Sequence, residues 1–157
     1  MVHVGEAIDE RIEMLERTQW VDEFSWKEIE IFARYLNINK ITKGTPVFYE
    51  GAQEAYMCIV ASGSVNVVKQ NVRNQEKVLS VITKGKTFGE MVLFDGEPRS
   101  ATIVSADNTV LLILTSENLD RLMREVPGLA AKLLFKLGKL LSQRLRMTSG
   151  KLVEFID

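Results

Sequence analysis

The spacing of apolar residues divides the chain into a helical beginning, a long middle section of short strands and a helical end. Over residues 7–15, apolar positions recur at intervals of three and four, which predicts an amphipathic helix. A second helix is predicted to begin at Ser25. Ser25 and Glu28 have the spacing of a capping box, in which each side chain binds a backbone N–H of the first turn. The apolar side of this helix consists of Ile29, Ile31, Phe32 and Leu36.

In the middle section, between Ile38 and Thr115, β-branched and aromatic segments alternate with glycine. Glycines 44, 51, 63, 85 and 96 fall between the segments, where tight turns favour a residue without a Cβ. Seven or so short strands joined in this way favour a β-sandwich or barrel over a βαβ sheet. The predicted strands are residues 38–42, 46–49, 57–61, 64–69, 77–83, 100–105 and 110–114.

The helical end is predicted to begin at Thr115 or Ser116, either of which can cap a helix that runs to about Arg124. Pro127 suits the first turn of a longer helix, and Gly150 is its predicted stop. This helix is expected to pack on the barrel, on a second subunit or on both, because its apolar stripe is wide. The stripe consists of Leu129, Leu133, Leu137, Leu141 and Leu145, widened by Ala130, Leu134 and Leu140.

Composition narrows the class of protein. The chain has 157 residues, 46% of them hydrophobic and 26% charged, which fits one soluble domain with or without a short appendage. A single cysteine, Cys58, excludes an intramolecular disulfide and predicts a reducing, cytoplasmic compartment and a buried thiol. A single histidine, His3, is too few for a multi-histidine metal site or a Ser-His-Asp mechanism. We therefore expect no enzyme, no metal and no cofactor.

Charge is unevenly distributed although the net charge is only −1. Acidic residues predominate over residues 1–30, whereas residues 127–151 carry basic residues and no acid. Each run is either a solvated helix face or one half of an attraction between the two ends, within one chain or between two. The low net charge gives no drive toward nucleic acid. The longest apolar run, residues 110–114, is too short to span a bilayer.

Residues 84–102 contain the residue types of an anion site. Arg99 offers a guanidinium fork, and the backbone N–H groups of Ser100 and Ala101 follow it directly. Glu90 can accept a hydrogen bond from a sugar hydroxyl, and the adjacent Gly89 lets the backbone approach a ligand closely. Taken alone, these residues leave an alternative, in which Glu90 and Arg99 form a surface ion pair around a loop.

The order of the residues favours the anion site. Phe88-Gly89-Glu90, eight further residues and Arg99-Ser100-Ala101-Thr102 together resemble the phosphate-binding cassette of the cyclic nucleotide-binding domain family. The resemblance extends to Gly44, Gly51, Gly85 and residues 59–65, and it covers about residues 20–147. It implies a mainly β fold with flanking α-helices, built on an eight-stranded jelly-roll barrel (a double-stranded β-helix). The implied division is N-terminal helices over 1–36, the barrel over 37–115 with the cassette at 85–102, lid or dimerisation helices over 116–150, and a tail over 151–157.

The resemblance also implies roles for the site residues. Arg99 would bind the cyclic phosphate, helped by the backbone N–H groups of Ser100 and Ala101 and by the Ser100 hydroxyl. Glu90 would accept the ribose 2′-hydroxyl, and Gly89 would allow close backbone approach. Further contacts are implied for Leu79, Ser80 and Met91, and on the last helix for Arg144 or Thr148 beside an apolar lid of Leu137, Leu140 and Leu141.

The implied function is a cyclic nucleotide-binding regulatory domain that signals by closure of its lid helix. Ser100 is compatible with either nucleotide, and we favour cAMP over cGMP. Seven residues after Gly150 cannot hold a recognition helix, so we expect no direct DNA binding. The domain then acts on an unidentified effector in trans, or it belongs to a longer chain, and the last helix suits a homodimer. The alternatives are a jelly-roll scaffold that no longer binds nucleotide, and a nucleic-acid binder using the basic helix.

Overall fold

The computed structural model describes residues 4–154 of the chain and the side chains of residues 10–151. These residues form two compact units, the first ending at Leu119 and the second beginning at Asp120. The first unit contains the N-terminal helices and all of the strands, and the second contains most of the C-terminal helical segment. His3 and the end of the tail, residues 155–157, lie outside the described residues.

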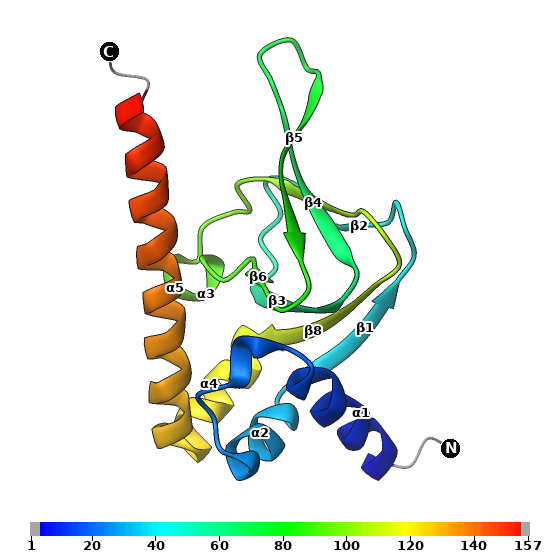
Figure 1. Cartoon of the computed structure of the whole chain (residues 1–157), viewed down its shortest axis with the longest axis vertical. Coiled ribbons are helices and arrows are strands. Elements are labelled where there is room, and N and C mark those ends of the chain that lie inside the picture. Colours follow the sequence, from blue (N-terminus) through cyan, green and yellow to red (C-terminus); the bar gives the residue numbers. More distant parts are fainter. Residues whose placement is uncertain (1–3, 155–157) are drawn as a thin grey trace. The chain divides into compact units, whose positions relative to one another are not determined.

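Two four-stranded antiparallel sheets make up the barrel, which confirms the predicted jelly roll (Figure 1). The strand order is β1-β8-β3-β6 in one sheet and β2-β7-β4-β5 in the other. Seven strands fall within three residues of their predicted bounds, whereas the two-residue β6 was not predicted. The strands are β1 (Asn37–Ile41), β2 (Pro46–Phe48), β3 (Tyr56–Ser62), β4 (Ser64–Gln70), β5 (Glu76–Thr83), β6 (Thr87–Phe88), β7 (Thr102–Ser105) and β8 (Thr109–Thr115).

The core of the barrel is built from alternating positions of these strands. Strand β3 contributes a continuous buried segment, in which Cys58 and Val60 join the core while Met57 and Ile59 are buried as well. The predicted burial of the Cys58 thiol is therefore confirmed. The buried residues of the cluster are Phe48, Cys58, Val60, Val65, Phe88, Ile103 and Leu111.

The N-terminal helices are α1 (Val4–Glu16), the 3-10 helix η1 (Gln19–Val21) and α2 (Trp26–Ala33). The capping box of α2 is confirmed: the Glu28 N–H donates to Ser25 Oγ at 3.2 Å, and the Ser25 N–H donates to Glu28 Oε1 at 2.9 Å. Trp20, Phe24 and Phe32 pack as an aromatic cluster with ring centroids 5.9–6.2 Å apart. The start of β1 is tied to α1, because Arg11 Nη1 donates to the carbonyl of Leu36 at 2.6 Å.

The C-terminal segment begins with α4 (Ser116–Glu125), where Thr115 Oγ1 accepts a hydrogen bond from the Asn118 N–H at 3.1 Å. Helix α5 (Pro127–Glu154) begins at Pro127 as predicted, but the predicted stop at Gly150 is wrong. A glycine ends a helix when the chain turns there with a positive φ. Gly150 has no positive φ and the helix continues through it. Over residues 4–154 we find no helix with the length and apolar character needed to cross a membrane.

Candidate functional site

The cassette segment runs from β6 through the short helix α3 (Val92–Asp95) to β7. Gly89 follows β6 with a φ of +75°, and Gly96 ends α3 with a φ of +67°. Both values lie in the left-handed region that favours glycine. The Asp95 carboxylate accepts a hydrogen bond from the Glu97 N–H at 2.9 Å and so closes the turn after α3. These local features set the path of the chain toward Arg99.

The backbone of Arg99 is fixed by the turn that follows β2. The Arg99 N–H donates to the carbonyl of Ala52 at 2.8 Å, and the Gly51 N–H donates to the carbonyl of Arg99 at 2.8 Å. Nearby, the Glu50 N–H donates to Thr102 Oγ1 at 2.9 Å. The cassette arginine is therefore held by a segment far from it in sequence.

The side chain of Arg99 is buried, with 6% of its surface exposed. Its Nη1 donates to the carbonyl of Gly89 at 2.8 Å, and its Nη2 donates to the carbonyl of Tyr56 at 2.7 Å. The guanidinium carbon lies 4.1 Å from the centre of the Phe48 ring and 4.7 Å from that of the Tyr56 ring. Two carbonyls and two aromatic rings thus surround the guanidinium.

No carboxylate among residues 10–151 forms an ion pair with Arg99. Burial lowers the pKa of Arg99, and the nearby Tyr56 and Cys58 side chains partly oppose this shift. An arginine nevertheless keeps its charge at neutral pH. The charge of Glu54 opposes the shift as well, but the direct contacts of the guanidinium are all neutral. Since buried charges are normally paired, a buried arginine without a carboxylate in direct contact is suited to an anionic ligand.

Three further residues of the predicted site belong to the same segment as Arg99. Ser100 and Ala101 directly follow it in the chain, and Glu90 is buried. Within the described chain, the backbone N–H groups of Ser100 and Ala101 donate no hydrogen bond. Glu90 is 2% exposed, and its carbonyl accepts a hydrogen bond from the Leu93 N–H at 3.1 Å. The alternative of a surface ion pair between Glu90 and Arg99 is wrong, because both side chains are buried.

The remaining predicted residues are more exposed or lie on the second unit. Leu79, 61% exposed, and Ser80 lie on β5, and Met91, 57% exposed, precedes α3. On α5, Thr148 Oγ1 donates to the carbonyl of Arg144 at 2.9 Å, and both side chains are exposed. Leu79, Ser80 and Met91 thus belong to the first unit together with Arg99, whereas Arg144 and Thr148 belong to the second.

Phe48 and Tyr56 were not predicted as site residues, although their rings contact Arg99. In the sequence both look like ordinary strand aromatics. Their contact with the arginine depends on how β2 and β3 pair with other strands, and no short-range spacing reveals it. The only local sequence signal near this contact is Gly51, which marks the turn that holds the Arg99 backbone.

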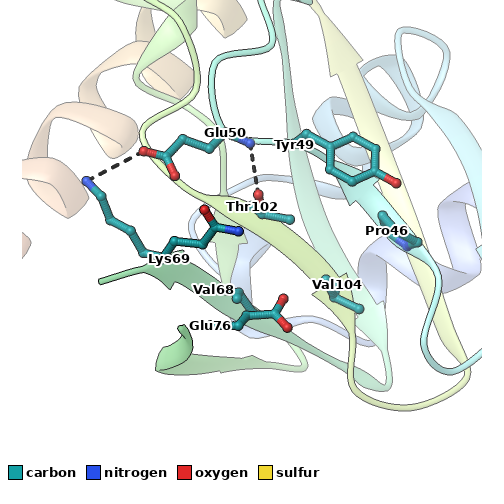
Figure 2. Close-up of a pocket in the computed structure, with 9 residues that line it drawn as sticks. Pro46, Tyr49, Glu50, Val68, Lys69, Glu76, Thr102 and Val104 are labelled. Atoms are coloured by element: carbon teal, nitrogen blue, oxygen red, sulfur yellow. Dashed lines mark hydrogen bonds and ion pairs between the residues drawn. The ribbon is translucent and has the colours of Figure 1, made fainter. Parts of the chain in front are cut away.

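A separate hollow of about 450 Å³ lies over β2, β4, β5 and β7 and includes neither Arg99 nor Glu90 (Figure 2). Glu50 crosses one side of it, 3.9 Å from the ammonium of Lys69. A second hollow, of about 410 Å³, is lined by Arg17, Lys84, Lys86 and the residues next to them.

Within residues 10–151, no three His, Cys, Asp or Glu side chains gather as a metal site would require.

A family model of the cyclic nucleotide-binding domain matches residues 38–126, which is more than half of the chain. The chain belongs to the cyclic nucleotide-binding domain family. This cyclic nucleotide-binding domain is 34% identical over 120 residues to the cyclic AMP receptor protein of Thermus thermophilus, an alignment that covers 76% of this chain and 54% of that protein. The chain therefore spans about half the length of this relative.

Two further comparisons agree with the family. The regulatory subunit of cAMP-dependent protein kinase from Candida albicans is 31% identical over 84 residues, which cover 54% of this domain and 17% of the subunit. The crystal structure of a cyclic nucleotide-binding domain from Methylobacillus flagellatus superimposes with a TM-score of 0.81 at 25% identity, covering 97% of this chain and 85% of that one. By their names, the Thermus thermophilus relative is a receptor and the Candida albicans relative a regulatory subunit.

Proposed function

We propose that the chain is a regulatory domain that binds cAMP in preference to cGMP and signals through its C-terminal helix. Arg99 carries the proposal, as a buried guanidinium held by two carbonyls and two rings rather than by a carboxylate of the described chain. A cyclic phosphate has one negative charge, which one arginine can match. The names of the relatives, a cyclic AMP receptor protein and a cAMP-dependent kinase subunit, support cAMP as the nucleotide.

The proposed contacts to the cyclic phosphate and the ribose come from groups whose chemistry matches each part of the nucleotide. Arg99 supplies charge-assisted hydrogen bonds, and the N–H groups of Ser100 and Ala101 add backbone donors, with the Ser100 hydroxyl beside them. Glu90 is a buried acceptor for the ribose 2′-hydroxyl. Gly89 adds no side chain and keeps the backbone open to the ligand.

The rest of the proposal concerns the base and the signal. Leu79, Ser80 and Met91 would line the nucleotide pocket, and Arg144 or Thr148 would contact the base. In this division, the barrel of residues 37–115 senses the nucleotide and residues 116–150 transmit the signal. The nucleotide shifts the lid helix from an open toward a closed arrangement only if it binds the closed arrangement more tightly. The effector is a partner in trans or a further domain of a longer chain, and helix α5 would pair two copies through its leucine stripe.

Calorimetric titration with cAMP and cGMP tests the binding proposal. The wild type is expected to bind cAMP with micromolar or tighter affinity and cGMP more weakly. Arg99→Ala removes a charged hydrogen-bonding group and should weaken cAMP binding by at least about tenfold. Arg73→Ala is the matched control, because Arg73 lies exposed in the turn between β4 and β5 and its loss should leave affinity unchanged.

Absence of cAMP and cGMP binding by well-folded wild-type protein would reject this function and favour the scaffold alternative. Equal affinity of the wild type and Arg99→Ala would reject Arg99 as the phosphate ligand. Hydrogen exchange tests the signal separately: saturating cAMP should change the protection of amides in α5, and unchanged protection would reject a moving lid.

A further inference from the structure

We infer that Phe48 and Tyr56 form an aromatic seat that orients the Arg99 guanidinium and thereby sets how tightly the site holds the phosphate. The aromatic seat is defined as the side-chain rings of these two residues. The inference rests on the proposed function, because it assigns positioning residues to the same site. It goes further by assigning a binding role to two strand residues outside the cassette.

The geometry of the seat fixes the plane of the guanidinium. The guanidinium carbon lies 4.1 Å from the Phe48 ring centre and 4.7 Å from the Tyr56 ring centre, both within cation–π range. The two rings meet edge to face, with centroids 6.1 Å apart and planes at 70°. Rings at this angle contact the guanidinium from two directions, while the carbonyls of Gly89 and Tyr56 hold two of its nitrogens. The side chain therefore has little freedom to rotate.

The seat is anchored in the core of the barrel. Phe48 is only 9% exposed, and its ring centre lies 5.9 Å from that of Phe88. Phe88 directly precedes Gly89, whose carbonyl accepts from Arg99. The Tyr56 hydroxyl reaches the carbonyl of Val47 at a long 3.4 Å. The Phe48 ring therefore contacts both the arginine and Phe88, the residue next to the one whose carbonyl accepts from the arginine.

The seat has an expected effect on affinity for two reasons. A free arginine side chain loses rotational freedom when it binds an anion, and an arginine already held in one orientation loses less. The rings also stabilise the positive charge without neutralising it, whereas a carboxylate partner would compete with the phosphate. An aromatic seat thus keeps the guanidinium buried, charged and available.

Binding measurements on Phe48 variants test this role. Phe48→Leu keeps an apolar side chain but removes the aromatic face, and it should weaken cAMP binding by about 2- to 30-fold. Phe48→Tyr restores a ring and should restore most of the affinity, although it disturbs core packing as well. Phe24→Leu is the matched control, since Phe24 is a buried aromatic that packs on Trp20 and Phe32. It should leave the affinity unchanged.

A second measurement, made without nucleotide, tests the contact itself. The free energy of unfolding is measured for Phe48→Leu, Arg99→Met and the double variant. If the ring stabilises the guanidinium, each substitution lowers the free energy of unfolding by less when the other is already present than it does in the wild type. Additive costs would overturn the contact and the inference with it.

The outcomes separate the seat from the proposed function. If the wild type binds cAMP and the Phe48→Leu variant binds it equally well, the aromatic seat is overturned and the proposed function stands. Equal loss in Phe48→Leu and Phe48→Tyr would also overturn it, because packing rather than an aromatic face would then explain the loss. If the wild type binds no cyclic nucleotide, the proposed function fails and the binding role of the seat fails with it, whatever the unfolding measurements give.

Discussion

The Nη1 of Arg99 donates to the carbonyl of Gly89 at 2.8 Å, and the same nitrogen lies only 2.7 Å from the point that a Cβ on residue 89 would occupy. That Cβ would also lie 3.3 Å from the carbonyl oxygen of Tyr56, which accepts the other hydrogen bond of the guanidinium. The absence of a side chain at position 89 is therefore a condition for the observed orientation of Arg99.

Gly89→Ala should displace Arg99 and weaken cAMP binding by at least about tenfold, because a charge-assisted contact depends on that orientation. The positive φ of +75° adds about 1–2 kcal/mol of destabilisation. Gly96→Ala is the control, since Gly96 has a similar φ of +67° and no atom within 4 Å of its Cβ point. Urea unfolding and cAMP titration are measured for both variants. A matching loss of affinity in the two variants would refute the steric argument.

The turn between β3 and β4 offers a prediction about stability alone. A Cβ on Gly63 would lie 2.4 Å from the carbonyl oxygen of Asn108 and 2.8 Å from the Cα of Thr109, so backbone would have to move. Gly44 has nearly the same φ, +86° against +83°, but no atom within 4 Å of its Cβ point. Gly63→Ala should therefore cost roughly 1–3 kcal/mol more unfolding free energy than Gly44→Ala. Chemical denaturation of both variants measures the difference, and equal costs would contradict it.

Much of the fold could be predicted because its signals are local. Gly63 and Gly85 mark turns where the chain adopts a positive φ, and the spacing of apolar residues between them gives the strands. The order of residues 88–102 likewise predicted a nucleotide site, through its resemblance to the cassette of a known family. Neither kind of signal needs knowledge of which strands pair.

The aromatic seat could not be predicted, because it depends on pairing between distant strands. Tyr56 lies 43 residues before Arg99 in the chain, yet its carbonyl accepts a hydrogen bond from the guanidinium. Gly150 shows a different limit. The residue type permits a helix stop but does not enforce one, and α5 continues through it.

The start of α2 provides a test of the capping box. Ser25→Ala removes the oxygen that accepts from the Glu28 N–H at 3.2 Å, and it should lower the free energy of unfolding by about 1 kcal/mol. Ser25→Asp keeps an acceptor at the same place and should stay close to the wild type. Thermal or urea unfolding distinguishes the two. Equal destabilisation by alanine and aspartate would mean that the hydroxyl contributes through something other than capping.

The thiol of Cys58 links folding to alkaline pH. Burial raises its pKa from an ordinary value of about 9 to about 12, partly opposed by the charge of Arg99. Above pH 9 the unfolded chain loses the thiol proton while the folded chain keeps it, so the unfolded state binds fewer protons and stability falls as pH rises. The stability that the protonated thiol contributes is therefore fully present below pH 9 and is lost progressively up to about pH 12.

Cys58→Ala removes this titration and isolates it from the other alkaline groups. The difference in unfolding free energy between the wild type and Cys58→Ala should be constant from pH 7 to 8.5 and should then shrink by about 1.4 kcal/mol for each further pH unit above 9. Urea unfolding at pH 7, 8, 9, 10 and 10.5 measures the difference. A difference that stays constant through pH 10.5 would mean that the thiol ionises as readily in the folded protein as in the unfolded chain, contrary to its full burial between the two sheets.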